Sequence, residues 1–329
     1  MKNFSAGYSF FVKKSVWLIA AGLVFSQATL AQQNKIDVAR RLLEYDQKLP
    51  LDIKEESSFE RPGARVHEMT FASPKGGRVT ASLVVPTQEG PHAGIVFGHW
   101  GNGNRTEFLP EAILLAEAGA ASIIIDYPWE RTAPWWKKMP GVTEPEKQVE
   151  LFIQAIVDLR RALDVLLARR DVDHQRIAYV GHSFGAQWGA ILAALDQRMK
   201  TAVLMAGVPS AASLWLESTG DAGVVEYRKS LPKEKLQNFV ELYSQLDAID
   251  FVPHAKPISL LFQFARQERI MAEEHMRQYA QAASEPKTVL WYDAGHELAD
   301  MQTMIDRADW LEKQIGLKPI KPILQKKLK

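Results

Sequence analysis

The stretch that decides the fold runs from Arg176 to Leu195 and reads RIAYVGHSFGAQWGAILAAL. The apolar run before Gly181 predicts a strand, and the ten residues from Ala186 onward predict a helix. Between them lies a G-x-S-x-G pentapeptide, which at a strand-to-helix junction predicts a sharp turn that holds the Ser183 hydroxyl clear of the sheet. A glycine-rich structural turn with an inert serine is the alternative, but the flanking strand and helix favour a nucleophile.

Seven further stretches predict strands around this one. Two of them flank the turn residues 74–77 as a hairpin, and five later ones lack period-two alternation, as expected for strands covered on both faces. They are Val66–Phe71, Val79–Val85, Ala93–Phe97, Ala121–Ile125, Thr201–Met205, Ile258–Phe264 and Thr288–Tyr292. Helical stretches alternate with them, the clearest being Glu144–Arg169, with Thr143 as N-cap and Pro145 in the first turn. This order predicts an α/β protein with a mostly parallel, eight-stranded, doubly wound sheet and helices on both faces.

The chain divides into five expected segments. Residues 1–31 are predicted to be a signal peptide, 32–65 an N-terminal helix or arm, and 66–316 the α/β domain. Within that domain, residues 207–254 are too long for a plain crossover and predict a small helical lid. Residues 317–329, with five lysines, are expected to be a solvated basic tail without a function of its own.

The first segment predicts export. Lys2, Lys13 and Lys14 precede an apolar run over 16–25, and small residues follow up to Ala31, which is the pattern of a cleavable secretory signal. The run is shorter than the roughly 20 residues that span a bilayer, so no stable membrane anchor is expected after cleavage. The expected location is the periplasm or the medium, with cleavage after either Ala28 or Ala31.

Composition excludes several classes of protein. Of 329 residues, 40 are Lys or Arg and 39 are Asp or Glu, a balance that argues against a nucleic-acid partner. There is no cysteine, which excludes disulfides, thiolate metal sites, a lipid-bearing cysteine and a cysteine nucleophile. We expect neither a cofactor nor a metal, and a small-molecule ester as the binding partner.

A serine nucleophile needs a base, and the chain offers eight histidines. His296 follows the last predicted strand, where a loop can return its imidazole to Ser183. His182 is next to the serine but lies on the wrong side of the turn. Of the others, His67, His92 and His174 are expected at the surface, and His275 on a polar helix.

The third member is expected to be a carboxylate between the serine and the histidine in the chain. Glu268 lies in the loop after the strand predicted to end at Phe264, at the carboxyl edge of the sheet. Asp247 and Asp250 are rivals that could return from the lid, whereas Asp293 lies too close to its own strand.

Acyl transfer also requires backbone N–H donors for the developing oxyanion. One is expected from Phe184, the residue after the nucleophile. The other is expected from the loop Gly98–Asn104, whose three glycines permit close approach of a substrate. Within that loop the amide of either Trp100 or Gly101 is suitable.

At this point the chain resembles the α/β-hydrolase fold enzymes, in particular dienelactone-hydrolase-like and acetyl-esterase-like serine hydrolases. The resemblance runs from about Val66 to Ile315 and is carried by Phe97–Gly101, Asp173–Ile177, Gly181–Ala186, Phe262–Glu268 and Ala294–His296. It implies a Ser183–Glu268–His296 triad, in agreement with the reading from the residues. The chain departs from the family in having Trp100 after His99, where glycine is usual, and in having Glu268 where aspartate is usual.

Five tryptophans are candidates for a substrate pocket. Trp129, Trp135 and Trp136 follow the fourth predicted strand and, with Trp100 and Trp215, are candidates for an apolar pocket over Ser183, although tryptophans also commonly pack a lid against its domain.

The expected function is hydrolysis of small acyl or aryl carboxylic esters through an acyl-enzyme. A serine peptidase or amidase on the same fold is the alternative, and a non-catalytic binding protein is a weaker one.

Overall fold

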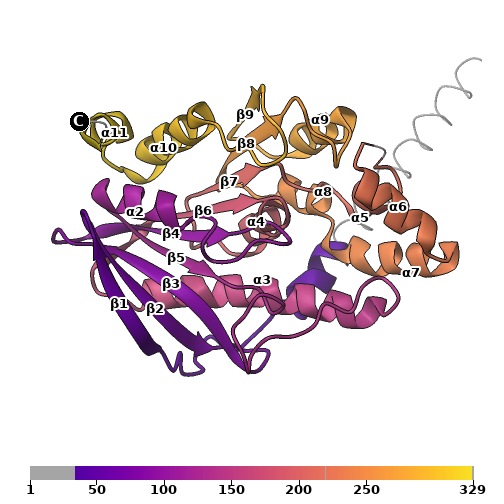
Figure 1. Ribbon diagram of the computed structural model, residues 1–329, viewed down its shortest axis with the longest axis horizontal. Helices are drawn as coiled ribbons and strands as arrows, with labels where there is room; N and C mark the ends of the chain where they lie inside the picture. Colours follow the sequence, from indigo (N-terminus) through magenta and orange to yellow (C-terminus); the bar gives the residue numbers. More distant parts are fainter. Residues whose placement is uncertain (1–33, 219, 328–329) are drawn as a thin grey trace, which may run out of the picture. The chain divides into compact units, whose positions relative to one another are not determined.

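The structure is a computed structural model that describes residues 34–218 and 220–327. Its central feature is one nine-stranded sheet with the order β1-β2-β3-β5-β4-β6-β7-β8-β9 (Figure 1). The strands are β1 Lys54–Arg61, β2 Ala64–Ala72, β3 Arg78–Pro86, β4 His92–Gly98, β5 Ala120–Ile125, β6 Val172–His182, β7 Thr201–Met205, β8 Ser259–Ala265 and β9 Lys287–Tyr292. All eight predicted strands are confirmed.

The sheet is parallel from β5 to β9, whereas β1, β2 and β3 form an antiparallel extension. β4 and β6 lie side by side although their sequences are far apart, and Gly98 is paired with Gly181. Every residue of β4, β5 and β7 is buried, as their continuous apolar runs predict for strands covered on both faces. The carboxyl ends of β4 and β6 therefore meet at one edge of the sheet.

The ninth strand, β1, was not predicted. Its sequence KEESSFER is charged and almost wholly exposed, so it shows neither alternation nor an apolar run. It forms because it pairs with β2 at the edge of the sheet, with a bulge between Glu55 and Ser57. Charged residues and a bulge are the usual means of keeping an edge strand from pairing with another chain.

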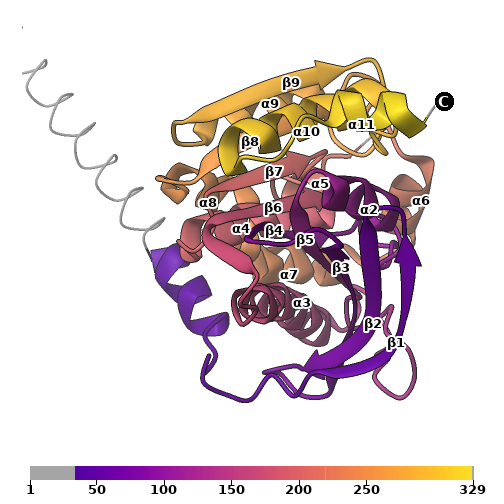
Figure 2. The same ribbon diagram turned by 90° about the vertical axis from the view of Figure 1, so that its left-hand side faces the viewer.

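Helices cover both faces of the sheet. α2, α10 and α11 pack on one face, and α3, α4, α8 and α9 on the other (Figure 2). Their bounds are α2 Leu109–Glu117, α3 Pro145–Leu167, α4 Phe184–Leu195, α8 Ala248–Phe251, α9 Glu273–Ala282, α10 Met301–Ile315 and α11 Ile320–Lys327. The long helix α3 begins one residue later than predicted, because Glu144 and not Thr143 is its N-cap, while Pro145 stands in the first turn.

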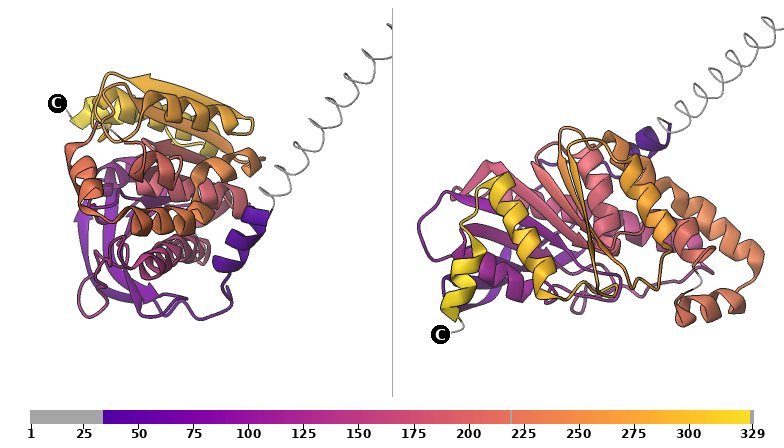
Figure 3. Two further views of the ribbon diagram at one scale, coloured as in Figure 1. Left: turned by 90° about the vertical axis from the view of Figure 1, so that its right-hand side faces the viewer. Right: turned by 90° about the horizontal axis from the view of Figure 1, so that it is seen from above.

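The insertion after β7 is helical, as expected. It contains α5 Ala211–Trp215, α6 Ala222–Ser230, α7 Lys233–Tyr243, η1 Ser244–Leu246, α8 and η2 Val252–His254, and Figure 3 shows α6 and α7 at one end of the sheet. The Tyr243 hydroxyl donates to Gln187 Oε1 on α4 at 2.9 Å, and Gln187 Nε2 donates to the Leu246 carbonyl at 3.2 Å. These buried hydrogen bonds fix the end of the insertion to the helix that follows the serine.

Two terminal predictions have different outcomes. The expectation of a solvated tail after residue 316 is wrong. Leu317 and Ile320 are buried in the same core as α2 and α10, and Ile323 and Leu324 on α11 pack against that core. Residues 34–42 are helical, within the expected N-terminal helix. The predicted signal peptide, 1–31, lies outside the described residues. None of the helices in the described part of the chain is long and apolar enough to cross a membrane.

An ion pair between α2 and α10 provides a test of how this face is held together. Arg307 is buried and binds both carboxylate oxygens of Glu111, at 2.8 and 2.6 Å, as well as Gln263 Oε1 at 2.9 Å. We expect Arg307→Leu to lower the free energy of unfolding by about 3–5 kcal/mol, because a buried carboxylate is left unpaired. Urea denaturation followed by circular dichroism measures the change.

The matched control is Arg277→Leu on α9. Arg277 pairs with Glu273 at the surface and lies over the Trp291 ring at 4.8 Å, so its loss is expected to cost less than about 1 kcal/mol. Equal losses in the two variants would contradict the role assigned to Arg307.

Candidate active site

Ser183 stands at the sharp turn between β6 and α4. Its φ is +54° and its ψ is −111°, a backbone conformation that side-chain-bearing residues rarely adopt and that here is held by its neighbours. The Ser183 N–H donates to the Met205 carbonyl on β7 at 2.8 Å, and the Ser183 carbonyl accepts from the Gln187 N–H at 2.9 Å. The backbone on both sides of the serine is therefore fixed.

The two glycines of the pentapeptide permit this turn. A Cβ on Gly181 would overlap the backbone of Gly185, and a Cβ on Gly185 would overlap the carbonyl oxygen of Gly98. The Gly185 N–H donates to the His99 carbonyl at 3.1 Å. The turn and the loop after β4 thus touch backbone to backbone.

His296 and Glu268 come together from two neighbouring loops. His296 Nδ1 lies 2.7 Å from Glu268 Oε2, and both side chains are buried, with 7% and 2% of their surface exposed. Glu268 follows β8 and His296 follows β9, and the Gln267 N–H donates to the Ala294 carbonyl at 3.1 Å. Parallel strands of similar length end at the same edge, which is why residues 28 positions apart meet.

The contacts of Glu268 define its charge and the tautomer of His296. Burial by itself raises the pKa of Glu268, but hydrogen bonds from His296 and from the N–H groups of Arg269 and Ile270 outweigh it, so the pKa lies below its ordinary value. An ionised carboxylate only accepts, so His296 Nδ1 carries the hydrogen. His296 Nε2 is buried and has no hydrogen-bond partner. It is therefore a lone-pair site ready to take a proton.

The rival acids have other partners. Asp247 Oδ1 accepts from the Ala211 N–H at 2.7 Å, at the base of the insertion. Asp293 Oδ1 accepts from Gln267 Nε2 at 2.8 Å, and Asp250 lies within α8.

We call residues 98–104 the oxyanion loop, because the sequence predicts an oxyanion donor there. Several of its backbone N–H and C=O groups form hydrogen bonds close to the Ser183 turn. The Trp100 N–H donates to Glu107 Oε2 at 3.0 Å, so it already has an acceptor in this structure. The Trp100 carbonyl accepts from the Gly103 N–H and the Gly101 carbonyl from Trp129 Nε1, at 3.1 and 2.8 Å. Among the hydrogen bonds of the described residues, none uses the Gly101 N–H.

The buried ring of His99 orients the oxyanion loop through hydrogen bonds. Burial lowers the pKa of His99 to about 3, so the ring is neutral. Nδ1 donates to the Trp100 carbonyl at 2.6 Å, and Nε2 accepts from the Tyr127 N–H at 3.4 Å. Because a trans peptide directs its C=O and N–H to opposite sides, fixing the Trp100 carbonyl on His99 turns the Gly101 N–H away from the interior.

Phe184 closes the other side of the candidate site. It begins α4, so its N–H lacks an intrahelical acceptor, and its ring lies 3.2 Å from the position of a Cβ on Gly101. The ring packs with Trp215 and Ile270 against a small buried cluster of Val208, Leu214 and Met271. An apolar wall thus adjoins the serine.

The tryptophans separate into different roles. Trp215 belongs to this apolar wall, and its role in a substrate pocket stays a prediction. Trp129 does not: it is 7% exposed, supports Gly101 through its indole N–H and packs on Tyr127 and Trp188. Trp135 lies against Gly77 in the β2–β3 turn, so neither it nor Trp129 is placed in the apolar wall. Trp136 is 54% exposed.

Other sequence assignments also change. His92 is buried at the start of β4 and is not a surface residue. The ring of His182 contacts Glu107 and the His296 carbonyl, as expected for a histidine that does not act as the base. Glu107 was not singled out from the sequence, because no local pattern marks it. Within the described residues there is no cluster of three or more His, Asp or Glu side chains that could hold a metal ion.

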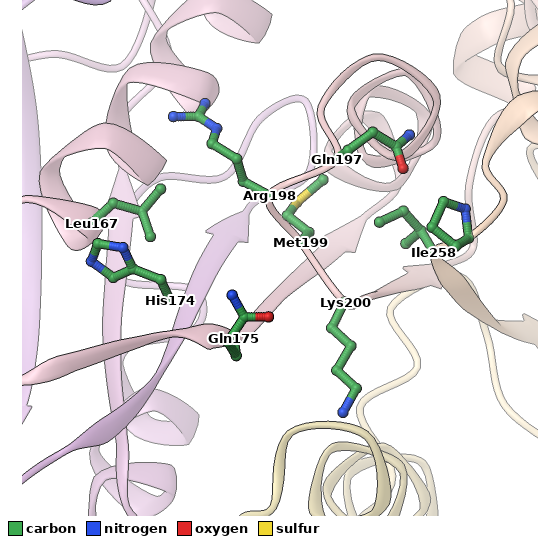
Figure 4. A pocket seen from close by; sticks show the side chains of 9 residues that line it. Leu167, His174, Gln175, Gln197, Arg198, Met199, Lys200 and Ile258 are labelled. Carbon is green, nitrogen blue, oxygen red and sulfur yellow. The ribbon is translucent and has the colours of Figure 1, made fainter.

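A separate cavity of about 540 Å³ lies at the opposite end of the same strands. Figure 4 shows its lining from the first residues of β6 and from the segments leading into β7 and β8, including His174, Arg198 and Lys200. Since Ser183 follows the last residue of β6, this cavity is not part of the candidate active site.

Comparison with known proteins agrees with this geometry. Residues 39–212 match the acetyl xylan esterase (AXE1) family, a span of more than half the chain that includes Ser183 and the oxyanion loop. Together with the fold, this match defines the chain as a carboxylic ester hydrolase of the α/β-hydrolase class, which confirms the resemblance found in the sequence. The chain belongs to the acetyl xylan esterase (AXE1) family.

Solved structures share the fold over most of the chain. The acetyl xylan esterase from Paenibacillus sp. R4 is 22% identical, with 85% of this chain and 93% of that one covered and a TM-score of 0.68. Acetyl xylan esterase 1 from Thermoanaerobacterium sp. JW/SL YS485 is 18% identical, with 84% and 92% covered and a TM-score of 0.66. The Pyrococcus furiosus esterase Pf2001 is 14% identical, with 80% and 99% covered and a TM-score of 0.57. A search of the curated proteins found no match.

The contact between Gly185 and Gly98 gives a prediction for the turn. We expect Gly185→Ala to lower the free energy of unfolding by about 1–3 kcal/mol, because the new methyl group forces two backbones apart. Displacing the serine from the oxyanion loop is also expected to lower kcat/KM on the order of 100-fold. Urea denaturation and ester hydrolysis measure the two effects.

Gly223→Ala on α6 is the control. There the methyl group meets only the Asp221 side chain, at 3.2 Å, and alanine is the better helix former by about 1 kcal/mol. A Gly185→Ala variant as stable and active as Gly223→Ala would disprove the close approach.

Proposed function

We propose that this protein hydrolyses small acyl esters, acetyl esters above all, through Ser183, His296 and Glu268. The observation that carries the proposal is the buried His296–Glu268 pair, in which His296 Nε2 has no hydrogen-bond partner. His296 lies in a loop near the strained turn of Ser183. Order along the chain, Ser–Glu–His, is that of α/β-hydrolases.

The reaction follows from the protonation states. His296 Nε2 takes the hydroxyl proton as Ser183 Oγ attacks the ester carbonyl carbon, and the resulting imidazolium is stabilised by the Glu268 carboxylate. The N–H groups of Phe184 and Gly101 bind the developing oxyanion. His296 then returns the proton to the departing alcohol. In the second half, His296 takes a proton from water as the water attacks the acyl-enzyme, and it returns that proton to Ser183 Oγ as the acid leaves. No step requires a metal or a cofactor.

The acyl preference rests on two points. The apolar wall formed by Phe184, Trp215 and Ile270 suits a short apolar acyl group close to the serine. The family is named for acetyl xylan esterases, so acetylated polysaccharide is the substrate class we propose. The signal-like sequence of 1–31 supports export to the periplasm or medium, where such polymers occur as substrates.

The first test is hydrolysis of p-nitrophenyl esters from acetate to octanoate, and of acetylated xylan, by the protein without residues 1–31. We expect the acetate ester to give the highest kcat/KM, and Ser183→Ala to lower kcat by at least about 10⁴-fold, because the hydroxyl forms the acyl bond. Release of p-nitrophenol and of acetate are the measurements.

Equal rates for Ser183→Ala and the unaltered protein would refute the proposal. An optimum at octanoate would refute the acyl preference alone. Faster cleavage of an aminoacyl amide than of the acetate ester would identify an amidase.

The identity of the acid is tested by Glu268→Gln. The amide can still accept from His296 Nδ1 but carries no charge to stabilise the imidazolium, so we expect kcat to fall by about 10²–10⁴-fold with KM little changed. Since the pKa of Glu268 lies below its ordinary value, the carboxylate stays ionised to a lower pH than an ordinary glutamate, so protonation of Glu268 is not expected to limit wild-type activity near neutral pH.

Asp250→Asn is the matched control for the rival acid and is expected to retain wild-type kcat. The assignment of Glu268 is wrong if this variant loses activity while Glu268→Gln keeps it.

A further inference from the structure

A second acid–histidine pair, Glu107 and His182, contacts the backbone of the proposed base, His296. His182 Nδ1 is 2.7 Å from Glu107 Oε1, and the two side chains are 4% and 20% exposed. His182 is the last residue of β6, and Glu107 lies in the segment between β4 and α2. The proposed mechanism uses neither side chain, although burying such a pair is costly unless its hydrogen bonds are satisfied.

Both ring nitrogens of His182 face acceptors. Nδ1 faces the Glu107 carboxylate, and Nε2 lies 2.9 Å from the carbonyl oxygen of His296. A carbonyl oxygen can only accept, and a neutral imidazole has only one N–H to donate. With Glu107 as a carboxylate, which only accepts, both contacts are hydrogen bonds only when His182 is an imidazolium.

The other carboxylate oxygen of Glu107 reaches the oxyanion loop. Oε2 accepts the Trp100 N–H at 3.0 Å, one residue before the proposed donor Gly101. A continuous bridge therefore runs from the His296 carbonyl through the His182 ring and the Glu107 carboxylate to the Trp100 N–H. It joins the backbone of the proposed base to the backbone of the oxyanion loop.

We propose that Glu107 and His182 are positioning residues that hold His296 and the oxyanion loop in register with Ser183, and that they do so only while His182 carries both ring protons. This inference rests on the proposed ester hydrolysis through Ser183. Neither side chain touches a reacting atom, so the pair acts on kcat through the placement of other groups.

Loss of one proton breaks the bridge at a defined place. The Glu107 carboxylate retains the Nδ1 hydrogen, so Nε2 becomes a lone pair facing the His296 carbonyl, and attraction turns into repulsion. The groups facing His182 are the Glu107 carboxylate, the His296 ring at 5.3 Å and the neutral His99, with the Trp100 ring at 6.4 Å. Among these side chains, only that of Glu107 is in hydrogen-bond contact with the ring.

Glu107→Gln separates the geometry of the bridge from its charge. The carboxamide oxygen can accept the Trp100 N–H while its NH₂ donates to Nδ1 of a neutral His182, whose Nε2–H remains on the His296 carbonyl. We expect wild-type kcat for the acetate ester to decline as pH rises and His182 loses its second proton. In Glu107→Gln we expect kcat within about threefold of wild type at pH 7, without that alkaline decline.

Glu107→Ala removes the bridge altogether. We expect kcat about 10–100-fold lower at pH 7 with KM changed little, as for a misplaced catalytic group. Glu60→Gln is the matched control, since it makes the same chemical change at an ion pair with Arg65 on the edge strand β1; its pH profile is expected to be that of wild type.

Nitrogen-15 NMR of histidine-labelled protein tests the proton count without reference to activity. At pH 7 we expect His182, assigned by its disappearance in His182→Asn, to show two ring N–H signals in wild type and one in Glu107→Gln. A single signal in wild type, or an alkaline decline in Glu107→Gln as steep as in wild type, would overturn the proposal. Activity of Ser183→Ala would instead overturn the proposed function, and the NMR result would stand apart from it.

Discussion

The arrangement of the whole site depends on the contact between two backbones at Gly98 and Gly185. β4 and β6 are adjacent parallel strands, so the loops that follow them are brought together, but a side chain at either glycine would push them apart. Hydroxyl groups hold the contact closed: Tyr179 donates to the Gly185 carbonyl at 2.7 Å, and Tyr127 donates to the His99 carbonyl at 2.8 Å. The distance between nucleophile and oxyanion donors is thus set by main-chain packing, which is stiffer than any loop side chain.

Buried charge at this edge of the sheet is paired or neutralised at each position. The pKa of Glu268 lies below its ordinary value, because His296 and two N–H groups of its own loop donate to the carboxylate. Glu107 is hydrogen-bonded to His182 and to the Trp100 N–H, whereas His99, which lacks an anionic partner, is neutral because burial lowers its pKa to about 3. A site of low dielectric strengthens each of these interactions and penalises any unpaired charge. In the proposed mechanism, the transition state would develop its charge among dipoles that are already oriented.

The sequence predicts what local patterns specify and misses what depends on distant contacts. Buried strands are visible as apolar runs, whereas Lys54–Arg61 is a strand only because β2 offers it a partner. Gly181–Gly185 is visible because strand, glycines and helix are contiguous. Glu107 is not, since its contact with His182 joins residues 75 positions apart. Our proposal of Gly101 rather than Trp100 as the oxyanion donor depends on a second long-range contact of Glu107, whose Oε2 accepts the Trp100 N–H.

Glutamate at position 268, where the family commonly has aspartate, is explained by how the loop uses the longer side chain. Oε1 accepts from the N–H groups of Arg269 and Ile270, at 2.9 and 2.8 Å, so the side chain folds back over its own loop. This leaves Oε2 directed at His296. The longer side chain allows this turn back over the loop. Because the two N–H donors fix one oxygen, little rotational freedom remains for the other. In this chain the length of the acid is therefore matched to the shape of the loop after β8.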